Sequence, residues 1–561
     1  MNATSTTLAG LLNGPYRYVI PLFQRDYVWK KKEWEDLWDD VVELWTSPKK
    51  DRNHFMGALV FVQEVTSSPK LPAFQVIDGQ QRLITLSTLL CALRDVASDH
   101  GYAGLASEID NYYLTHPKKD EEHFRVYPRW RDRDQYVAAV GHKMVPGETI
   151  SSALNFFTRQ ITLRGTTNPE ESLRTLFETL SQRLEFVQVS LTGSDYPLQI
   201  FRSLNSTGVE LAESDLIRNS MFMKVGPQGQ DEFDSKHWGP LERHFEHRDP
   251  KQKGKLDGKG FSAFLRDFLM HKGSYVGLNA TFEQFERYYK DWPDPVKVVE
   301  ELEGYVELYG AIRGTRSLRA ADPKPDDKLD DALKQLRQLE NSTPYPLILN
   351  LLDRVKARTS SRDDAAHAIR LVSSFILRRY VSNLTSRTYG KWFVSAALQL
   401  QDNPLENLRS FLQDKGFPDD AEFQTAFVAL DLYNGNYARA VLKAMEASLA
   451  HKEMPNLSEA QVEHIMPQRL TKEWIPMVGP QDGPVHQQWL HTPGNLTLTK
   501  YNGELAQKSF LEKRKIFEKS NYSLTRRLYQ PNLLIWGQSQ IQARGKWLAE
   551  IAKNIWINPN F

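Results

Sequence analysis

Hydrophobic residues recur at two different spacings along the 561-residue chain. Segments near the amino-terminal end alternate polar and apolar residues, or run apolar over a few positions, as β-strands do. The strand candidates are the start of 17–29, then 54–63 and 73–77. Other segments repeat apolar residues every three or four positions, which is typical of amphipathic helices. These helical segments are 30–45, most of 104–200, 345–355 and 368–383. The pattern predicts an α+β fold that is predominantly helical.

The length predicts two to four domains, each with its own core. Residues 246–260 and 313–329 are rich in charge, Pro and Gly, so we expect loops or linkers there. We divide the chain into an amino-terminal domain at 1–225, a helical middle at 226–440 that couples the two ends, and a carboxy-terminal domain at 441–561. The sequence contains no internal repeat.

Charge is nearly balanced over the whole chain, with 71 Lys and Arg against 70 Asp and Glu. Binding to nucleic acid would therefore have to be local. Residues 463–561 carry 13 Lys and Arg against 7 Asp and Glu, a net charge of +6. Such an excess suits a phosphate backbone, although a solvated helix face has the same composition. The candidate DNA contacts are Lys500, Lys508, Lys513 and Arg514, followed by Lys515, Lys519, Arg526 and Arg527.

The single cysteine, Cys91, lies in an apolar run and is expected to be a core residue. One cysteine excludes an internal disulfide framework and a Cys-based zinc site. No run is apolar enough to cross a membrane, and the first residues lack the pattern of a secretory leader. We therefore expect a soluble, cytoplasmic protein.

Two motifs near the carboxy-terminal end combine a histidine with two asparagines: VEHIMPQ at 462–468 and HTPGNLTLTKYN at 491–502. Each includes a short strand pattern, and 503–520 has helical periodicity. His464 suits a general base that activates water, because imidazole titrates near neutral pH. Glu463 and Asn502 could supply oxygen ligands to Mg²⁺ or Mn²⁺. Asn495, next to a turn glycine, is expected to brace the hairpin and orient His464.

This order of two strands and a helix is that of a ββα-metal, or HNH, endonuclease, which makes His464, Asn495 and Asn502 the catalytic candidates. The alternative is a surface strand that carries a histidine by chance.

A second motif, IDGQQRLITL, begins at residue 77. The pattern predicts a strand that stops at Asp78, a tight turn at Gly79 and an apolar helix from about Arg82. A helix amino terminus with a nearby arginine is an anion site. The candidate ligands are Asp78 for a metal or ribose hydroxyl, Gln80 and Gln81 for phosphate or water, and Arg82 and Arg25 for phosphate. The alternative is a polar turn that caps a core helix.

A third block, FRSLNSTGVELAESDLIRNSMF at 201–222, contains a turn at Asn205 and Gly208 and a helix start near Ser214. Asn205 either contacts the nucleotide or only caps local structure.

The motif EHI-x-P followed by GNLTL and Asn resembles the carboxy-terminal nuclease domain of GmrSD-type, modification-dependent restriction enzymes. IPLFQRDYVW, HFMGALVF and IDGQQRLITL together resemble the amino-terminal domain of that family, which is related to the ParB/sulfiredoxin-like fold. The resemblance implies that the amino-terminal domain binds and hydrolyses a nucleoside triphosphate. It also implies that the carboxy-terminal domain cuts double-stranded phage DNA carrying modified bases. A double-strand cut by one such nuclease site would favour a homodimer.

Two other functions stay open at this stage. One is a ParB-like nucleotide switch that holds DNA and has weak or no nuclease activity. The other is a nuclease directed at RNA, or a toxin-like nuclease.

Overall fold

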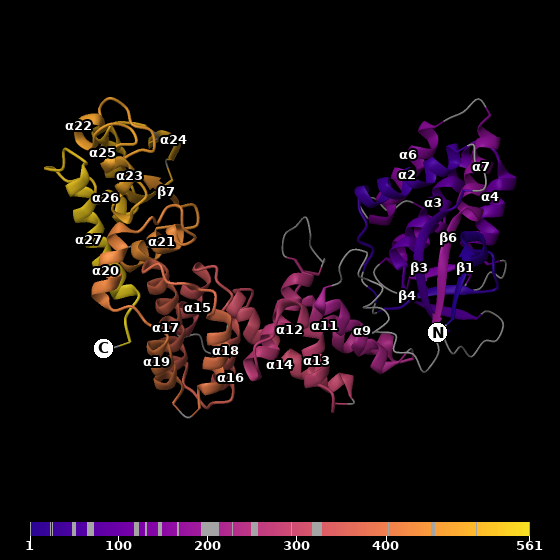
Figure 1. The fold of residues 1–561 in the computed structure, drawn as a ribbon, viewed down its shortest axis with the longest axis horizontal. Helices are drawn as coiled ribbons and strands as arrows, with labels where there is room; N and C mark the ends of the chain where they lie inside the picture. The colour runs from indigo at the N-terminus through magenta and orange to yellow at the C-terminus, as the bar shows by residue number, and fades with distance from the viewer. Residues whose placement is uncertain are drawn as a thin grey trace. The chain divides into compact units, whose positions relative to one another are not determined.

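A computed structural model places most of the chain, and Figure 1 gives its elements. The structure describes residues 2–22, 24, 26–47, 52–63, 72–116, 123–128, 132–143, 149–164, 168–191, 212–226, 228–247, 256–292, 294–316, 328–401, 403–449, 455–500, 502–505 and 507–559. For Asn502 it describes the backbone alone. Arg25 and Asn205 lie outside the described residues, as do most of the 246–260 and 313–329 segments. Contacts divide the chain into two compact units. The first comprises 1–262 with 285–299, and the second 263–284 with 300–561.

A mixed six-stranded sheet forms the centre of the first unit (Figure 1). Its strands are β1 (Asn2–Thr7), β2 (Arg17–Ile20), β3 (His54–Gln63), β4 (Ala73–Asp78), β5 (Val126–Pro128) and β6 (Leu184–Leu191), in the order β1-β6-β3-β4-β2-β5. β2 pairs in parallel with both β4 and β5, while β4 runs antiparallel to β3. The ends of β2 and β4 therefore lie side by side, which brings the segments that follow them together.

Helices cover this sheet because their apolar faces need burial. They are α1 (Leu8–Leu12), α2 (Lys31–Thr46), α3 (Gln80–Asp99), α4 (Ala103–Ile109), α5 (Arg133–Val140), α6 (Thr149–Leu163) and α7 (Pro169–Gln182). α3 packs against α4, α5, α6 and α7 and is buried along nearly its whole length, including Cys91. Such a helix is apolar on all sides because it has neighbours on all sides. The expected core position of Cys91 is confirmed.

Three strands were missed by the sequence analysis, the short β5 among them. β6 lies in the region expected to be mostly helical, and β1 lies at the amino-terminal end of the chain. β6 holds the sheet together by pairing with both β1 and β3. Its sequence LEFVQVSL does alternate in burial, but it directly follows the helical pattern of α7 and was read as part of it.

Helices make up most of the described residues between the two motif-bearing ends. They are α9 (Glu213–Val225), α10 (Gln230–Phe233), α11 (Gly239–Arg243), α12 (Gly258–Lys272), α13 (Thr281–Tyr288), α14 (Pro295–Arg313), α15 (Lys328–Gln338), α16 (Tyr345–Lys356), α17 (Arg362–Val381), α18 (Tyr389–Gln399), α19 (Pro404–Asp414), α20 (Asp420–Ala429) and α21 (Ala438–Ser448). The expectation of a predominantly helical α+β fold is confirmed at that level. The finer ParB-like assignment stays a prediction, as do the three domain boundaries.

A two-stranded antiparallel sheet, β7 (Gln461–His464) with β8 (Leu496–Thr499), lies in the second unit. The helices around it are α22 (Ile475–Val478), α23 (Pro484–Trp489), α24 (Asn502–Leu505), α25 (Phe510–Glu518), α26 (Ser523–Arg526) and α27 (Gln538–Ile555). α27 packs along α20 and α21 (Figure 1). The single helix expected at 503–520 is two helices, because Ser509 caps a new one through the amide of Glu512.

Within the part of the chain that is described, no helix combines the length and the apolar character that a membrane crossing requires.

Candidate active site

The hairpin predicted from the two carboxy-terminal motifs is present. Glu463 and His464 end β7 and pair with Thr497 and Leu496 at the start of β8. The two motifs, separated by the 22 residues 469–490, therefore meet at one end of the small sheet. Both residues are largely buried: 8% of the surface of Glu463 and 5% of the surface of His464 is exposed.

Asn495 fixes the turn in front of β8. Its side-chain oxygen accepts hydrogen bonds from the Met466 amide at 2.7 Å and the Trp536 indole at 3.1 Å. Its nitrogen donates to the carbonyl oxygens of Met466 at 3.0 Å and Leu490 at 2.8 Å. The residue is fully buried, so all of its polar atoms act within the protein. The geometry matches the bracing expected of Asn495.

The turn is also held from outside by α27. The buried guanidinium of Arg544 donates to the carbonyl oxygens of Gly494 at 3.0 Å and Leu496 at 2.6 Å. Burial lowers the pKa of Arg544 to about 9. Gly494 is needed for this close approach, because a Cβ atom there would lie 2.1 Å from the carbonyl oxygen of Ile541. The sequence analysis did not identify Arg544, which lies far along the chain from the turn.

The His464 ring has a polar neighbour at each nitrogen. Its Nε2 lies 3.1 Å from Nδ1 of His491, and its Nδ1 lies 3.4 Å from Nε2 of Gln468. Burial, with the neighbouring His491 and the Lys513 ammonium, lowers the pKa of His464 to about 3. The imidazole is therefore neutral at physiological pH, which is the form that accepts a proton.

Glu463 forms a buried ion pair with Lys513. The ammonium nitrogen lies 2.8 Å from Glu463 Oε1 and 2.7 Å from the His464 carbonyl oxygen. Burial raises the pKa of Glu463 and lowers that of Lys513, while their mutual attraction opposes both shifts. Lys513 was expected to contact DNA. That expectation is corrected, because its fully buried side chain is engaged inside the protein.

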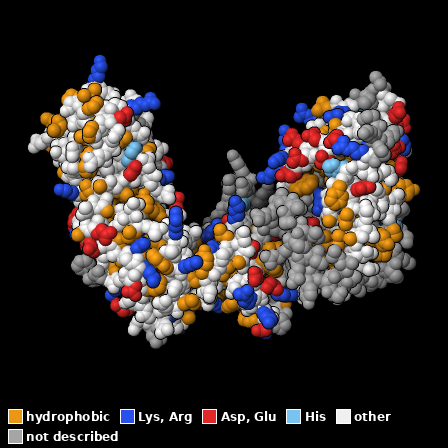
Figure 2. All heavy atoms as spheres, in the orientation of Figure 1, with side chains coloured by type: hydrophobic (Ala, Val, Ile, Leu, Met, Phe, Trp, Pro, Cys, Tyr) orange, Lys and Arg blue, Asp and Glu red, His pale blue; other side chains and the backbone are white. Residues whose placement is uncertain are grey.

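The other basic candidates differ in their exposure. Lys508 is exposed, and the partly exposed Lys500 pairs with Glu459 at 2.7 Å. Arg514 is largely buried, donates to the Gln530 carbonyl oxygen and lies over the Tyr529 ring. On the face drawn in Figure 2, the Lys and Arg side chains of the described residues are interspersed with Asp and Glu.

A divalent ion could be held by few protein groups here. Among the described residues, no three His, Cys, Asp or Glu side chains form a ready metal cage. Glu463 supplies one carboxylate, and Asn502 begins α24 without a described side chain. Mg²⁺ retains several waters and often takes only one or two carboxylates together with substrate phosphate. Of the two sequence candidates, the structure describes the side chain of Glu463 alone, and it could serve as one such carboxylate.

The three amino-terminal motifs also meet in space. Gln24 donates to the Ile77 carbonyl oxygen at 2.9 Å. Gln81 accepts from the Val28 amide at 2.9 Å and donates to the Asp26 carbonyl oxygen at 3.1 Å. The polar insert after β2 is thus attached to the first turn of α3. Gln81 acts as a brace between these segments, whereas the sequence analysis considered it a ligand for phosphate or water.

Arg82 connects IDGQQRLITL to HFMGALVF. It donates to the Met56 carbonyl oxygen at 2.7 Å and lies 3.6 Å from the Asp78 carboxylate. Gly57 has a φ of +99°, and a Cβ there would lie 2.4 Å from the Arg82 guanidinium. The glycine of HFMGALVF therefore makes room for the arginine of IDGQQRLITL. The side chains of Arg82 and Asp78 are both mostly buried, whereas those of a polar surface turn would be exposed.

The first turn of α3 keeps the features of an anion site. Gly79 precedes the helix at φ +96°, where a side chain would be strained and would meet Leu59. No side chain caps this 20-residue helix, and its first turn carries no acidic residue. Gln80 lies in this turn and is 5% exposed. The predicted strand, turn and helix are confirmed, with the helix beginning two residues before Arg82.

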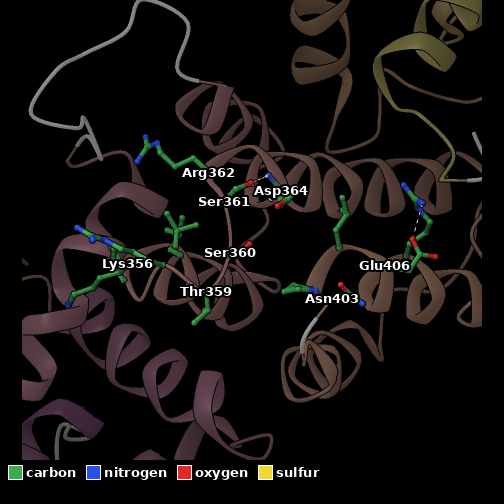
Figure 3. A pocket seen from close by; sticks show the side chains of 15 residues that line it. Lys356, Thr359, Ser360, Ser361, Arg362, Asp364, Asn403 and Glu406 are labelled. Carbon is green, nitrogen blue, oxygen red and sulfur yellow. Dashed lines mark hydrogen bonds and ion pairs between the residues drawn. The ribbon is translucent and has the colours of Figure 1, made fainter.

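A surface groove of about 860 Å³ lies elsewhere, between α16, α17 and α19 (Figure 3). Lys356, Arg362 and Arg409 line it, but so do Asp364 and Glu406. Ser361 caps α17 and bonds Asp364, while Glu406 pairs with Arg409 at 3.0 Å, as the dashed lines in Figure 3 indicate. Both acidic side chains of the groove are thus engaged by neighbouring groups, and none of the candidate catalytic residues lines it.

Comparison with known proteins agrees with both ends of the chain. The family model described as the GmrSD restriction endonuclease, N-terminal domain, matches residues 8–222. The model described as the GmrSD restriction endonucleases, C-terminal domain, matches residues 417–551 and so includes the hairpin, its bracing helix and the Glu463–Lys513 pair. A search of curated proteins found no match. The two matched domains, in this order on one chain, identify the protein as a member of the GmrSD restriction endonuclease family.

Proposed function

We propose that this restriction endonuclease is a nucleotide-regulated, metal-dependent enzyme of the HNH type that cuts double-stranded phage DNA with modified bases. The observation that carries the proposal is the hairpin end, where a neutral His464 and the carboxylate of Glu463 stand beside a turn fixed by Asn495. Family membership supports cleavage of DNA. The choice of modified DNA rests on the resemblance to modification-dependent enzymes.

In the proposed reaction, His464 takes a proton from the water that attacks the phosphodiester. Its low pKa opposes proton uptake, so His464 would act as the base only when the imidazolium is stabilised, and the negatively charged substrate phosphate would supply that stabilisation. Glu463 and Asn502 would hold Mg²⁺ or Mn²⁺. When bound, such an ion supplies positive charge to the phosphate and the leaving oxygen. Asn495 would hold the turn before β8 in place and thereby fix the orientation of His464.

The amino-terminal domain is proposed to bind and hydrolyse a nucleoside triphosphate at the start of α3. The uncapped first turn and the lack of acidic residues in it favour a phosphate group at this end of the helix. Asp78, Gly79, Gln80 and Arg82 would line the pocket, with Gln81 as a brace. Arg25 and Asn205 remain candidate ligands from the sequence.

The Glu463–Lys513 ion pair also supports an alternative function, that of a nucleotide switch with weak or no nuclease activity. Because Glu463 already pairs with a cation, the nuclease centre would have weak metal affinity until DNA arrives. A nucleotide switch with little nuclease activity would share this feature.

The proposal is tested by cleavage of defined DNAs with the full-length protein. Unmodified, hydroxymethylated and glucosylated phage DNA, together with RNA, would be incubated with Mg²⁺ or Mn²⁺, with and without nucleoside triphosphate. We expect metal-dependent cutting of modified DNA that His464→Ala removes. His367→Ala is the matched control, since that histidine is exposed on α17 in the same compact unit. Equal cutting by wild type and His464→Ala would refute the catalytic assignment, and RNA cleavage alone would identify an RNA nuclease.

The nucleotide site is tested separately through phosphate release. Asp78→Asn should remove hydrolysis, while Asp99→Asn, at the exposed far end of α3, should not. Arg82→Lys should also lose activity, because lysine keeps the charge but not the fork-shaped donor. Unchanged turnover in Asp78→Asn would contradict the pocket. His464→Ala should leave phosphate release intact, since the two sites lie in different compact units.

A further inference from the structure

A second histidine lies in contact with the proposed base. Nδ1 of His491 is 3.1 Å from Nε2 of His464, and the two rings meet edge to face with centroids 5.2 Å apart. One hydrogen bond joins these nitrogens, so one of them carries the proton and the other accepts it. The orientation of one ring therefore determines how the other can be placed.

His491 is itself held by a segment from another part of the chain. Its carbonyl oxygen accepts hydrogen bonds from the amides of Leu432 at 3.0 Å and Tyr433 at 3.2 Å. The Tyr433 ring stacks on the His491 ring, with an angle of 13° between their planes, and it also touches His464 at a centroid distance of 4.2 Å. The loop after α20 thus fixes both histidines, through backbone contacts on one and ring contacts on both.

We infer that His491 is a positioning residue for His464. It holds the imidazole by its Nε2 edge while Gln468 faces the opposite nitrogen, so that the ring cannot rotate about its Cβ–Cγ bond. This inference rests on the proposed role of His464 as the base. A base that is pre-oriented in this way avoids the cost of ordering the ring when water and DNA arrive. The sequence analysis quoted the motif that begins with His491 but assigned the residue no role.

Three variants of the full-length protein separate positioning from mere packing. His491→Leu fills the space but removes the hydrogen bond. His491→Asn restores a polar atom near the Nδ1 position. Tyr433→Leu removes the stacking ring but leaves the histidine pair, and it serves if His491→Leu proves unstable. His367→Ala is the control for loss of a histidine.

The first measurement is single-turnover cleavage of the DNA that the wild type cuts. We expect His491→Leu to lower the rate about 10- to 100-fold with little change in DNA affinity, as for other residues that orient a reacting side chain. His491→Asn should recover most of the loss. A His491→Leu rate equal to wild type, or loss of DNA affinity in place of rate, would overturn the inference.

A second measurement does not depend on cleavage. In protein labelled with ¹⁵N-histidine, the ring signals of His464 are those absent from His464→Ala. These signals should shift in His491→Leu and stay in place in His367→Ala. If they do not move in His491→Leu, the histidine pair does not position the base. If they move but the wild type cuts no nucleic acid, the pair stands and the proposed nuclease function fails.

Discussion

The ammonium nitrogen of Lys513 lies 2.8 Å from a carboxylate oxygen of Glu463, and the lysine side chain is completely buried. The ammonium also donates to the carbonyl oxygen of His464, the next residue. Helix α25 is therefore tied to the end of β7 at the proposed centre. A buried charge pair of this kind is costly to break on one side only, because the remaining charge keeps its desolvation penalty.

Removing the lysine alone should destabilise the protein strongly. We expect Lys513→Met to lower the free energy of unfolding by about 3 kcal/mol or more, since Glu463 is left without its partner. The double variant Lys513→Met/Glu463→Gln should recover a large part of this loss. Urea denaturation monitored by tryptophan fluorescence measures both. Lys515→Met is the control on the same helix, because Lys515 is exposed. Equal losses in the single and double variants would show that Lys513 contributes through packing.

Asn495 should contribute to stability as much as to activity. Asn495→Ala leaves four buried backbone and indole groups without their partner. Each such group costs about 1–3 kcal/mol, less when water can enter, so we expect a total loss of at least about 3 kcal/mol. Thermal unfolding is the measurement, and Asn554→Ala on the exposed side of α27 is the control. A variant as stable as the wild type would exclude the bracing role.

The contact between the turn and α27 should be intolerant of even one added methyl group. In Gly494→Ala the new carbon would lie 2.1 Å from a backbone oxygen of Ile541, so the turn or the helix must shift. We expect a marked fall in the thermal midpoint together with lost cleavage. Gly503→Ala has open space around it and should be close to neutral. The close packing would be in doubt if the two alanine variants unfolded at the same temperature.

Asp267 should make stability depend on pH. It is buried on α12 and accepts a hydrogen bond from the Tyr309 hydroxyl at 2.8 Å. Burial raises the pKa of Asp267 from 3.8 to about 7. Its contribution is therefore fully present below about pH 4 and is lost as pH rises towards 7, because the unfolded chain releases the proton first.

Asp267→Asn keeps a neutral side chain at every pH. The stability of the wild type relative to this variant should fall between pH 4 and 7 and level off above that range. Urea unfolding at a series of pH values gives the difference, in which shared effects of other groups cancel, such as the lowered pKa of His464. A difference that is constant with pH would mean that Asp267 is charged in the folded protein.

Local sequence patterns predicted where helices and strands lie far better than they predicted which elements pair or pack with one another. The strands β3, β4, β7 and β8 and the helix α3 follow from apolar spacing and from the turn glycine at residue 79. β6 was missed because its eight residues directly continue a helical stretch, and only pairing with β1 and β3 makes it a strand.

The same limit applies to the site. His464 and Asn495 were recognisable from residue type and spacing, whereas Lys513 resembled any other lysine on a basic helix. Burial is a property of the folded chain, so only the packing of α25 against β7 separates Lys513 from the exposed Lys515. Arg544 lies outside both carboxy-terminal motifs, and His491 begins one of them at a position to which its residue type and spacing assigned no role.

The late position of Arg544 in the sequence determines when the turn before β8 can be stabilised during synthesis. The arginine that holds the turn before β8 lies 51 positions after Pro493, one of the residues whose carbonyl oxygen it binds. A ribosome therefore completes both motifs of the hairpin well before it delivers their clamp. During that interval the nascent domain has both strands of the hairpin but lacks the buried arginine that holds the turn between them. The turn therefore reaches its final form only after α27 has been synthesised.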